Sequence, residues 1–488
     1  MAESPVAPRV EGEPQVNAEP ERFVGLQMSP VNFLDEGVEP LLDMLRDRFA
    51  VNAIMIGTVS WLGLKVGRRV SRALEGWPDH GHQDETPLRG GSYLAPRPAQ
   101  YERTSLKQFR APDEVFAGID VLDLVLAPAA ERGIRVYADL MEPMFNYLGH
   151  GSSQRVELPG LAQVMQVDCL GRIAAEPCLN HPDYRNWLWS VVEDHASNYA
   201  GLAGIMWCNE RRSPLDAALA GSAPHCFCSH CERLAAAEGV DVGRARTGLE
   251  AMWRLIGELR AGVAKVDGAL IAFLRTLYAH PDILTFERFW VERNKALDRE
   301  LYGIVKFCDR RLEFGLNVWN RNHLNLWRKA QWPWREQAQW ADWVKPIVYQ
   351  HQSGGIFFDE WSPLLGGVFR DLDPELVVEL AKAVLGLDEV ALGEMIATGF
   401  DPDTYVESQC RETVAALEGA IPVYMGIGVD APRSRPEQAV CTPDIVRRSV
   451  LATFRAGGTG VIFGPAYSGM NLTTLDGAAE AFRELDRV

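Results

Sequence analysis

Short apolar, β-branched runs alternate with amphipathic helical patterns along the chain from about Arg22 onward. Eight such runs predict strands, at Phe23–Met28, Asn52–Gly57, Arg135–Leu140, Ala203–Trp207, Glu313–Trp319, Lys345–Tyr349, Pro422–Ile427 and Gly460–Phe463. The amphipathic stretches predict helices at Val38–Phe49, Ile119–Arg132, Tyr184–Tyr199, Glu375–Leu385 and Pro443–Ala456. Because alternating strands and helices build parallel sheets, eight repeats predict an α/β fold of the (β/α)8 TIM-barrel type.

Three long stretches interrupt the repeat after strands two, three and four: Trp61–Ala117, Phe145–Leu179 and Ser213–Leu301. The first is rich in Gly, Pro and His, and we expect a loop over one end of the barrel. The third contains a cysteine cluster followed by long helical patterns. We therefore expect a single barrel domain over residues 22–488, with a cysteine loop and helical insertion around 213–301. Residues 1–21 are rich in Pro and Glu and predict a disordered tail.

Composition narrows the range of functions. The chain has 488 residues, of which 47% are hydrophobic and 24% charged, as in an ordinary globular protein. Its net charge of −17 disfavours binding to nucleic acid or to an anionic membrane. No apolar run reaches the roughly 18 residues of a membrane span, and the first residues lack the pattern of a secretory signal. We expect a cytoplasmic protein whose nine cysteines are reduced, which favours metal binding over disulfides.

Three of these cysteines, Cys226, Cys228 and Cys231, fall within six positions. A tetrahedral zinc site needs four soft ligands, so a tight loop of this kind can supply three. The candidates for the fourth are Cys178, Cys208, His225 and His230. We select Cys178, in a loop that precedes a predicted helix. Four thiolates close the coordination shell, so the expected cofactor is a structural Zn²⁺; the alternative is a loop packed by buried thiols.

A charged group follows strand four directly, in the sequence Cys208-Asn209-Glu210-Arg211. The barrel fold places its chemistry at the carboxyl ends of the strands, so Glu210 is a candidate catalytic residue. In glycoside hydrolysis this carboxyl would protonate the leaving oxygen, and Asn209 would bind a sugar hydroxyl. Alternation along the strand puts Cys208 on the same face as Glu210. The alternative is a structural carboxylate paired with a neighbouring arginine.

Three segments together resemble the family 42 β-galactosidases: Cys178–Arg185, Ile205–Glu210 and Cys226–Cys231. Those enzymes are barrel glycosidases of the large retaining superfamily, with an Asn-Glu acid/base after strand four and a zinc ion held by cysteines. The resemblance implies that Glu210 is the general acid/base and Asn209 a sugar contact. It also implies the zinc ligands Cys178, Cys226, Cys228 and Cys231. The close match covers about 55 residues.

Strand seven departs from that family. In the family 42 enzymes the nucleophile is a glutamate at the end of strand seven. Here the segment Ile421–Asp430 contains no glutamate. Asp430 is the acid nearest that end, and we expect it to be the second catalytic carboxylate; the alternative is a turn residue before Ala431-Pro432. The competing acids are Glu142 after strand three, and Asp359 and Glu360 in the expected loop after strand six. The separation of the two carboxyls would decide between retention and inversion.

Aromatic and amide side chains follow strands five and six, as in many carbohydrate sites. The candidate substrate-binding residues are Trp319, Asn320, Tyr349 and His351. Large aromatic residues also fill barrel cores, which is the alternative for any one of them. The sequence thus predicts a glycoside hydrolase acting on a small oligosaccharide or glycoside. The alternatives are a non-catalytic carbohydrate-binding barrel and an inverting or atypical enzyme with another second acid. The expected partner is a small carbohydrate, and self-association is left open.

Overall fold

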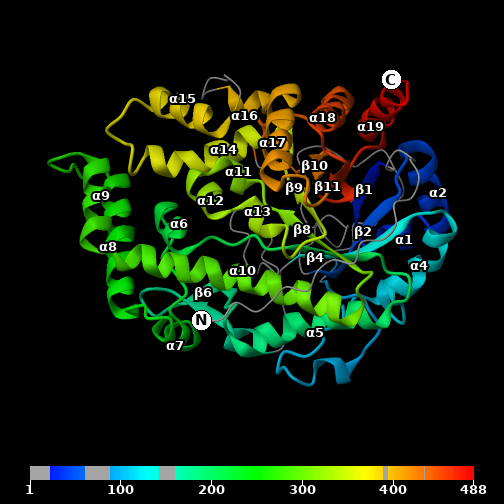
Figure 1. Cartoon of the computed structure of the whole chain (residues 1–488), viewed down its shortest axis with the longest axis horizontal. Helices are drawn as coiled ribbons and strands as arrows, with labels where there is room; N and C mark the ends of the chain where they lie inside the picture. Colours follow the sequence, from blue (N-terminus) through cyan, green and yellow to red (C-terminus); the bar gives the residue numbers. More distant parts are fainter. Residues whose placement is uncertain are drawn as a thin grey trace.

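The computed structural model describes residues 22–60, 88, 90–141, 160–387, 394–432 and 435–487. At its centre, eight parallel strands follow one another in the order β10-β11-β1-β2-β4-β7-β8-β9 (Figure 1). Their bounds are β1 Phe23–Met28, β2 Ala53–Ser60, β4 Arg135–Met141, β7 Gly204–Cys208, β8 Glu313–Val318, β9 Trp343–Pro346, β10 Tyr424–Gly428 and β11 Gly460–Gly464. Two isolated parallel bridges, Val344 to Val423 and Ile347 to Gly426, join β9 to β10 and close the barrel. The predicted TIM barrel is confirmed.

Helices surround the barrel (Figure 1). They are α2 Val38–Phe49, α4 Val121–Glu131, α5 Pro182–Asn198, α10 Asp282–Cys308, α17 Pro402–Leu417, α18 Pro443–Arg455 and α19 Leu472–Leu485. Of these, α17, α18, α19, α2 and α4 pack in series, and α5 packs against α10. Four of the predicted helices match members of this set to within three residues at each end. The fifth prediction matches α15, Pro374–Leu385. Among the described helices, none combines the length and the hydropathy that crossing a bilayer requires.

The insertion between β7 and β8 is helical, as predicted. It consists of α6 Pro214–Leu219, α7 Ser229–Ala237, α8 Val242–Arg260, α9 Ala269–Ala279 and the start of α10. These helices bury an apolar cluster of their own, in which Phe227 and Phe286 stack at 4.9 Å between ring centroids. The insertion before α5 contains an antiparallel hairpin, β5 Met165–Val167 and β6 Ile173–Pro177. The predicted tail, and residues 61–87, 89 and 142–159 of the other insertions, lie outside the described residues.

The shorter elements complete the chain. In the first insertion, β3 (Gly91–Ser92) pairs antiparallel with β2. The short helices of the remaining loops are α1 Asn32–Asp35, α11 Arg321–Leu324, α12 Leu326–Gln331, α13 Trp334–Gln337 and α16 Met395–Thr398, with α14 Gln350–Leu365 as a longer one. The 3-10 turns are η1 Pro98–Tyr101, η2 Glu114–Phe116, η3 Leu161–Gln163 and η4 Tyr467–Gly469.

Alternate residues of each strand fill the barrel, because successive side chains of a strand point to opposite faces. The amino-terminal half of the interior is a buried apolar plug: Phe23, Ala53, Met55, Tyr137, Met206, Trp343, Tyr424 and Ile462. Glu313 accepts hydrogen bonds from the Tyr137 hydroxyl at 2.8 Å and from the Trp343 indole at 3.0 Å. Gly315 makes room for Trp343, since an added Cβ would lie 2.2 Å from that ring. The packed plug leaves the other end of the barrel, here called the mouth, for chemistry.

The region after strand six differs from its prediction. The strand, β9, ends at Pro346, and Tyr349 precedes α14 with φ 10° and ψ 66°. Asp359 and Glu360, expected in a loop, therefore lie on a helix. Two consecutive glycines conceal this helix in the sequence because glycine disfavours helical structure. The structure shows why a glycine stands there: a Cβ on Gly354 would lie 1.7 Å from the carbonyl oxygen of Met395.

Candidate functional site

A layer of polar side chains lies above the aromatic plug. Lys345 of β9 donates a hydrogen bond from Nζ to Oε1 of Gln27 at 2.6 Å, and Nε2 of Gln27 donates to Oδ2 of Asp139 at 2.8 Å. All three side chains are buried. An amide from β1 thus joins a cation from β9 to a carboxylate from β4. These groups form the floor of the mouth.

Glu210 follows the end of β7 by two residues. The Cys208 thiol donates a hydrogen bond to Oε1 of Glu210 at 3.2 Å. The side chains of Cys208 and Glu210 therefore lie on the same side of the chain, as predicted. The Tyr349 hydroxyl donates to Oε1 of Gln27 at 3.3 Å. Burial, and then the nearby Glu210, Asp139 and Cys208, raise the pKa of Tyr349 well above its usual range. Tyr349 is therefore a protonated donor within electrostatic reach of Glu210.

The residues beside Glu210 have partners on other elements. Asn209 donates from Nδ2 to Oδ1 of Asn294 on α10 at 2.5 Å. Arg211 lies 3.5 Å from a carboxylate oxygen of Glu176. The contact of Asn209 with a sugar stays a prediction.

Asp430 lies two residues beyond β10, in a left-handed conformation with φ 44°. Its Oδ2 accepts hydrogen bonds from the backbone N–H of Asn471 at 2.7 Å and from Nδ2 of Asn471 at 3.1 Å. The end of the strand itself has no room for an acid. A Cβ on Gly428 would lie 2.9 Å from both the Cβ of Tyr349 and the Cε1 of His351. Asp430 is the acid that follows this strand end, and its hydrogen bonds to Asn471 anchor the start of α19.

The remaining predicted substrate-binding residues lie in the segments that follow β8 and β9. The Trp319 ring has the guanidinium of Arg328 at 4.4 Å and that of Arg321 at 5.2 Å from its centroid. Asn320 is buried at the start of α11. His351 is buried in the first turn of α14, and burial lowers its pKa to about 4, so it is neutral at pH 7. Their contact with a sugar stays a prediction.

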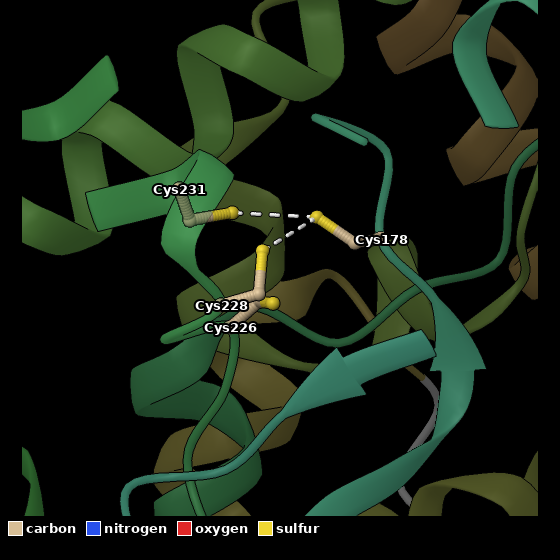
Figure 2. Close-up of side chains that lie close together, drawn as sticks. All are labelled: Cys178, Cys226, Cys228 and Cys231. Carbon is tan, nitrogen blue, oxygen red and sulfur yellow. Dashed lines mark hydrogen bonds between the residues drawn. The ribbon is translucent and has the colours of Figure 1, made fainter. Parts of the chain in front are cut away.

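The four predicted metal ligands come together. Cys178, Cys226, Cys228 and Cys231 are buried, and their sulfur atoms all lie within 4.8 Å of one another. Figure 2 shows Cys178 on the segment that follows the β5–β6 hairpin, facing the other three across the start of α7. Its Sγ lies 3.4 Å from those of Cys228 and Cys231. The alternatives for the fourth ligand are not members of this cluster.

The chemistry of this cluster fits a metal cation. Sulfur atoms bound to one tetrahedral zinc lie about 3.8 Å apart, close to the observed spacing. The neighbouring thiols lower the pKa of Cys228 and raise that of Cys178, so without a cation these buried cysteines do not favour the thiolate together. A bound cation removes this conflict, because it stabilises all four thiolates together. The cluster can therefore hold a metal.

Comparison with known proteins gives a match of fold. No family model matches the chain, and no curated protein matches it in sequence. Three solved structures that it resembles are β-galactosidases, from the psychrophilic Marinomonas ef1, Rahnella sp. R3 and Bacillus circulans sp. alkalophilus. Their TM-scores are 0.52, 0.51 and 0.50, at sequence identities of 13%, 12% and 10%. The likeness is one of fold.

The alignments cover 95%, 97% and 96% of this chain but 59%, 57% and 56% of the three β-galactosidases. This chain therefore spans little more than half of their length. The structural neighbours are glycosidases, and at these identities the match carries the barrel rather than the activity.

Three other acids, Glu360, Asp359 and Glu142, compete with Asp430 for the role of second catalytic carboxylate. Glu360 is buried and ion-paired with Arg212 at 2.6 Å and with Arg321. These arginines outweigh burial and lower the pKa of Glu360 to about 2. Asp359 is paired with Arg435. Glu142 lies outside the described residues.

Sequence reasoning missed several residues of the mouth. Gln27, Asp139 and Lys345 form its floor, and Asn317 on β8 is paired in register with Lys345. Asn317 is 5% exposed, and its Oδ1 accepts no hydrogen bond. One signal was available, because each is a polar residue at an inward-facing position of a predicted strand. A buried polar side chain at such a position implies either a partner or a ligand.

Proposed function

We propose that this protein is a glycoside hydrolase that cleaves a glycosidic bond of a small oligosaccharide or glycoside, in the manner of a β-galactosidase. The observation that carries the proposal is the position of Glu210. Its carboxylate stands at the mouth, with the Cys208 thiol on Oε1 and the Tyr349 phenol in electrostatic reach. The glycosidase fold of the structural neighbours supports the same reading.

In the proposed reaction, Glu210 gives its proton to the leaving oxygen and then takes a proton from water. Asp430 is the proposed second carboxylate. Asn471 holds this carboxylate in place through two hydrogen bonds to its Oδ2. Tyr349, kept protonated by burial, would donate to charge that develops at the mouth. Asn209, Trp319, Asn320 and His351 are proposed to contact the sugar.

We propose that the metal is Zn²⁺ bound by Cys178, Cys226, Cys228 and Cys231. Four thiolates fill the coordination shell, so the ion would be structural and would leave no position open for a substrate. It would tie the β5–β6 region to the start of α7.

The test compares Glu210→Gln with the parent protein on two substrates. We expect turnover of a natural glycoside to fall by about 10²–10⁴-fold, because general acid catalysis contributes that much. An aryl glycoside with an acidic leaving group should be much less affected in the glycosylation step. Asp430→Asn should slow both substrates alike, since it removes the second acid. The matched control is Glu412→Gln, which alters a half-exposed glutamate paired with Lys329 on the outside of the barrel. Equal and mild effects of Glu210→Gln and Asp430→Asn on both substrates would refute the proposal.

A second candidate function is a non-catalytic carbohydrate-binding barrel. The observation that favours it is the close packing of Tyr349 and His351 on Gly428, which removes the site of a strand-end nucleophile. This candidate predicts that sugar binding is retained in Glu210→Gln and Asp430→Asn and that the parent protein shows no turnover. A different second acid in an inverting or atypical enzyme predicts instead that only Glu210→Gln loses activity.

A further inference from the structure

A buried cluster of charges stands beside the candidate active site and is assigned no role in the proposed reaction. It contains three arginines and two acids, from three consecutive units of the barrel: Arg212 and Asp216 after β7, Arg321 and Arg328 after β8, and Glu360 on α14 after β9. Arg212 comes two residues after Glu210, and Arg321 comes three residues after the end of β8. Because β7 and β8 are neighbours in the sheet, these arginines start from the same side of the mouth as Glu210.

The acids of this cluster are covered, whereas two of the arginines reach the surface. The side chains of Glu360 and Asp216 are 1% and 3% exposed. Those of Arg212 and Arg321 remain 26% and 17% exposed. The part of this cluster that solvent reaches is therefore the guanidinium-bearing side chains of Arg212 and Arg321.

Inside the cluster, Arg328 is ion-paired with Asp216 at 2.7 Å. Its side chain is 6% exposed, and its Nε has no hydrogen-bond partner. Burial lowers the pKa of Arg328, and the neighbouring Arg212 and Arg321 act in the same direction, against Asp216 and Glu360. A further anion beside the cluster would be stabilised by all three guanidiniums, since charges interact strongly where water is excluded.

We propose that Arg212 and Arg321 form a subsite for an anionic group on the sugar, so that the substrate is an acidic glycoside. A carboxylate and a sulfate each present at least two oxygen atoms that accept hydrogen bonds. A guanidinium can donate to two such oxygens at once. The choice of a sugar as ligand rests on the proposed glycosidase function. Binding of the anionic group by Arg212 and Arg321 does not depend on turnover.

The decisive variant is Arg321→Gln. It removes one exposed guanidinium but leaves Glu360 with two partners, Arg212 at 2.6 Å and Nδ2 of Asn325 at 2.7 Å, so the fold is expected to survive. Binding of D-galacturonate, D-galactose 6-sulfate and D-galactose is measured by calorimetry at low salt on the full chain. We expect the parent protein to bind at least one acidic sugar about tenfold or more tightly than galactose. The variant should lose about 10–100-fold in that affinity and nothing for galactose.

Two further variants separate charge from structure. Arg321→Lys keeps the positive charge but lacks the paired N–H donors of a guanidinium. It should therefore recover only part of the lost affinity. Arg370→Gln removes an arginine of similar exposure that pairs with Asp371 far from the mouth, and it should leave all affinities unchanged. If Arg321→Gln lowers only the melting temperature, or if it weakens acidic and neutral sugars equally, the cluster merely joins the loops and the proposal is overturned. A parent protein that prefers galactose would overturn it as well.

Failure of this subsite and failure of the proposed function give different results. Hydrolysis of neutral glycosides without any preference for acidic sugars would overturn the subsite and leave the glycosidase in place. Tight binding of an acidic sugar that Arg321→Gln abolishes, without turnover of any glycoside, would support the subsite and refute the glycosidase. The ratio of kcat/KM for an acidic and a neutral aryl glycoside gives the same comparison where turnover is present.

Discussion

Replacing Cys178 by serine isolates what the cysteine cluster does for stability. The other three cysteines lie within six residues of one another, so only Cys178 links this loop to a distant part of the chain. Cys178 and Cys231 are 53 positions apart. A link that closes a loop of that length removes unfolded-state entropy worth about 4 kcal/mol at 25 °C. Cys178→Ser should therefore lower the free energy of unfolding of the metal-bound protein by about this amount.

The expected change in melting temperature follows from chain length. Unfolding entropy near 60 °C is about 2.1 cal/mol/K per residue, or about 1 kcal/mol/K for the 488 residues. A loss of about 4 kcal/mol then lowers the Tm by about 4 °C. The assay is thermal unfolding with added zinc and with a chelator, together with elemental analysis, which should find about one zinc per chain. The chelator should lower the parent protein to the level of Cys178→Ser and leave the variant almost unchanged.

The control is Cys410→Ser, which alters a buried thiol on α17 outside the cluster. Its Tm deficit should be the same with and without chelator. A Cys178→Ser deficit that is also independent of chelator, or a parent protein without bound metal, would refute the reasoning.

Three further changes test other features. Cys208→Ala removes the donor to Oε1 of Glu210, so the basic limb of the kcat/KM profile should move to higher pH by up to about one unit; an unmoved limb would separate the thiol from catalysis. Burial lowers the pKa of His323 from 6.5 to about 3, so the unfolded chain takes up a proton that the folded chain refuses. Stability present above pH 6.5 should fall by up to about 1.4 kcal/mol per pH unit below it, and His323→Gln should flatten that slope in denaturant titrations. Gly428→Ala should cost about 1–3 kcal/mol of stability, because its Cβ would meet Tyr349 and His351; a fully stable variant would show that β10 has room for a side chain.

The order of strands and helices could be predicted from the sequence because each element carries its own pattern. Alternation and helical periodicity are local consequences of which face is buried. For this reason β1 and α2 match their predicted bounds to the residue. The cysteine cluster could be predicted as well, because three of its members lie in one short loop. Glu210 could be found because the end of an apolar strand is visible in the sequence.

The helix after β9 could not be predicted in the same way. Its two glycines, Gly354 and Gly355, indicate a loop when only local preferences are considered. Contact with the backbone of Met395, a residue that is distant in sequence, leaves no space for a side chain at Gly354. Tertiary packing therefore overrides the local preference at this point.

The sequence by itself determined the barrel, a cysteine cluster that can hold a metal, and a carboxylate just beyond the end of β7. Only the tertiary structure decided which side chains surround that carboxylate, because the floor joins Gln27, Asp139 and Lys345 from three strands far apart in the chain. It also decided that Gly428 cannot be an acid and that Asp430 holds the start of α19. The physical reason is the same in each case. The pattern of buried and exposed positions is local in the sequence. The partner of a buried polar group depends on which strands the closed barrel brings together.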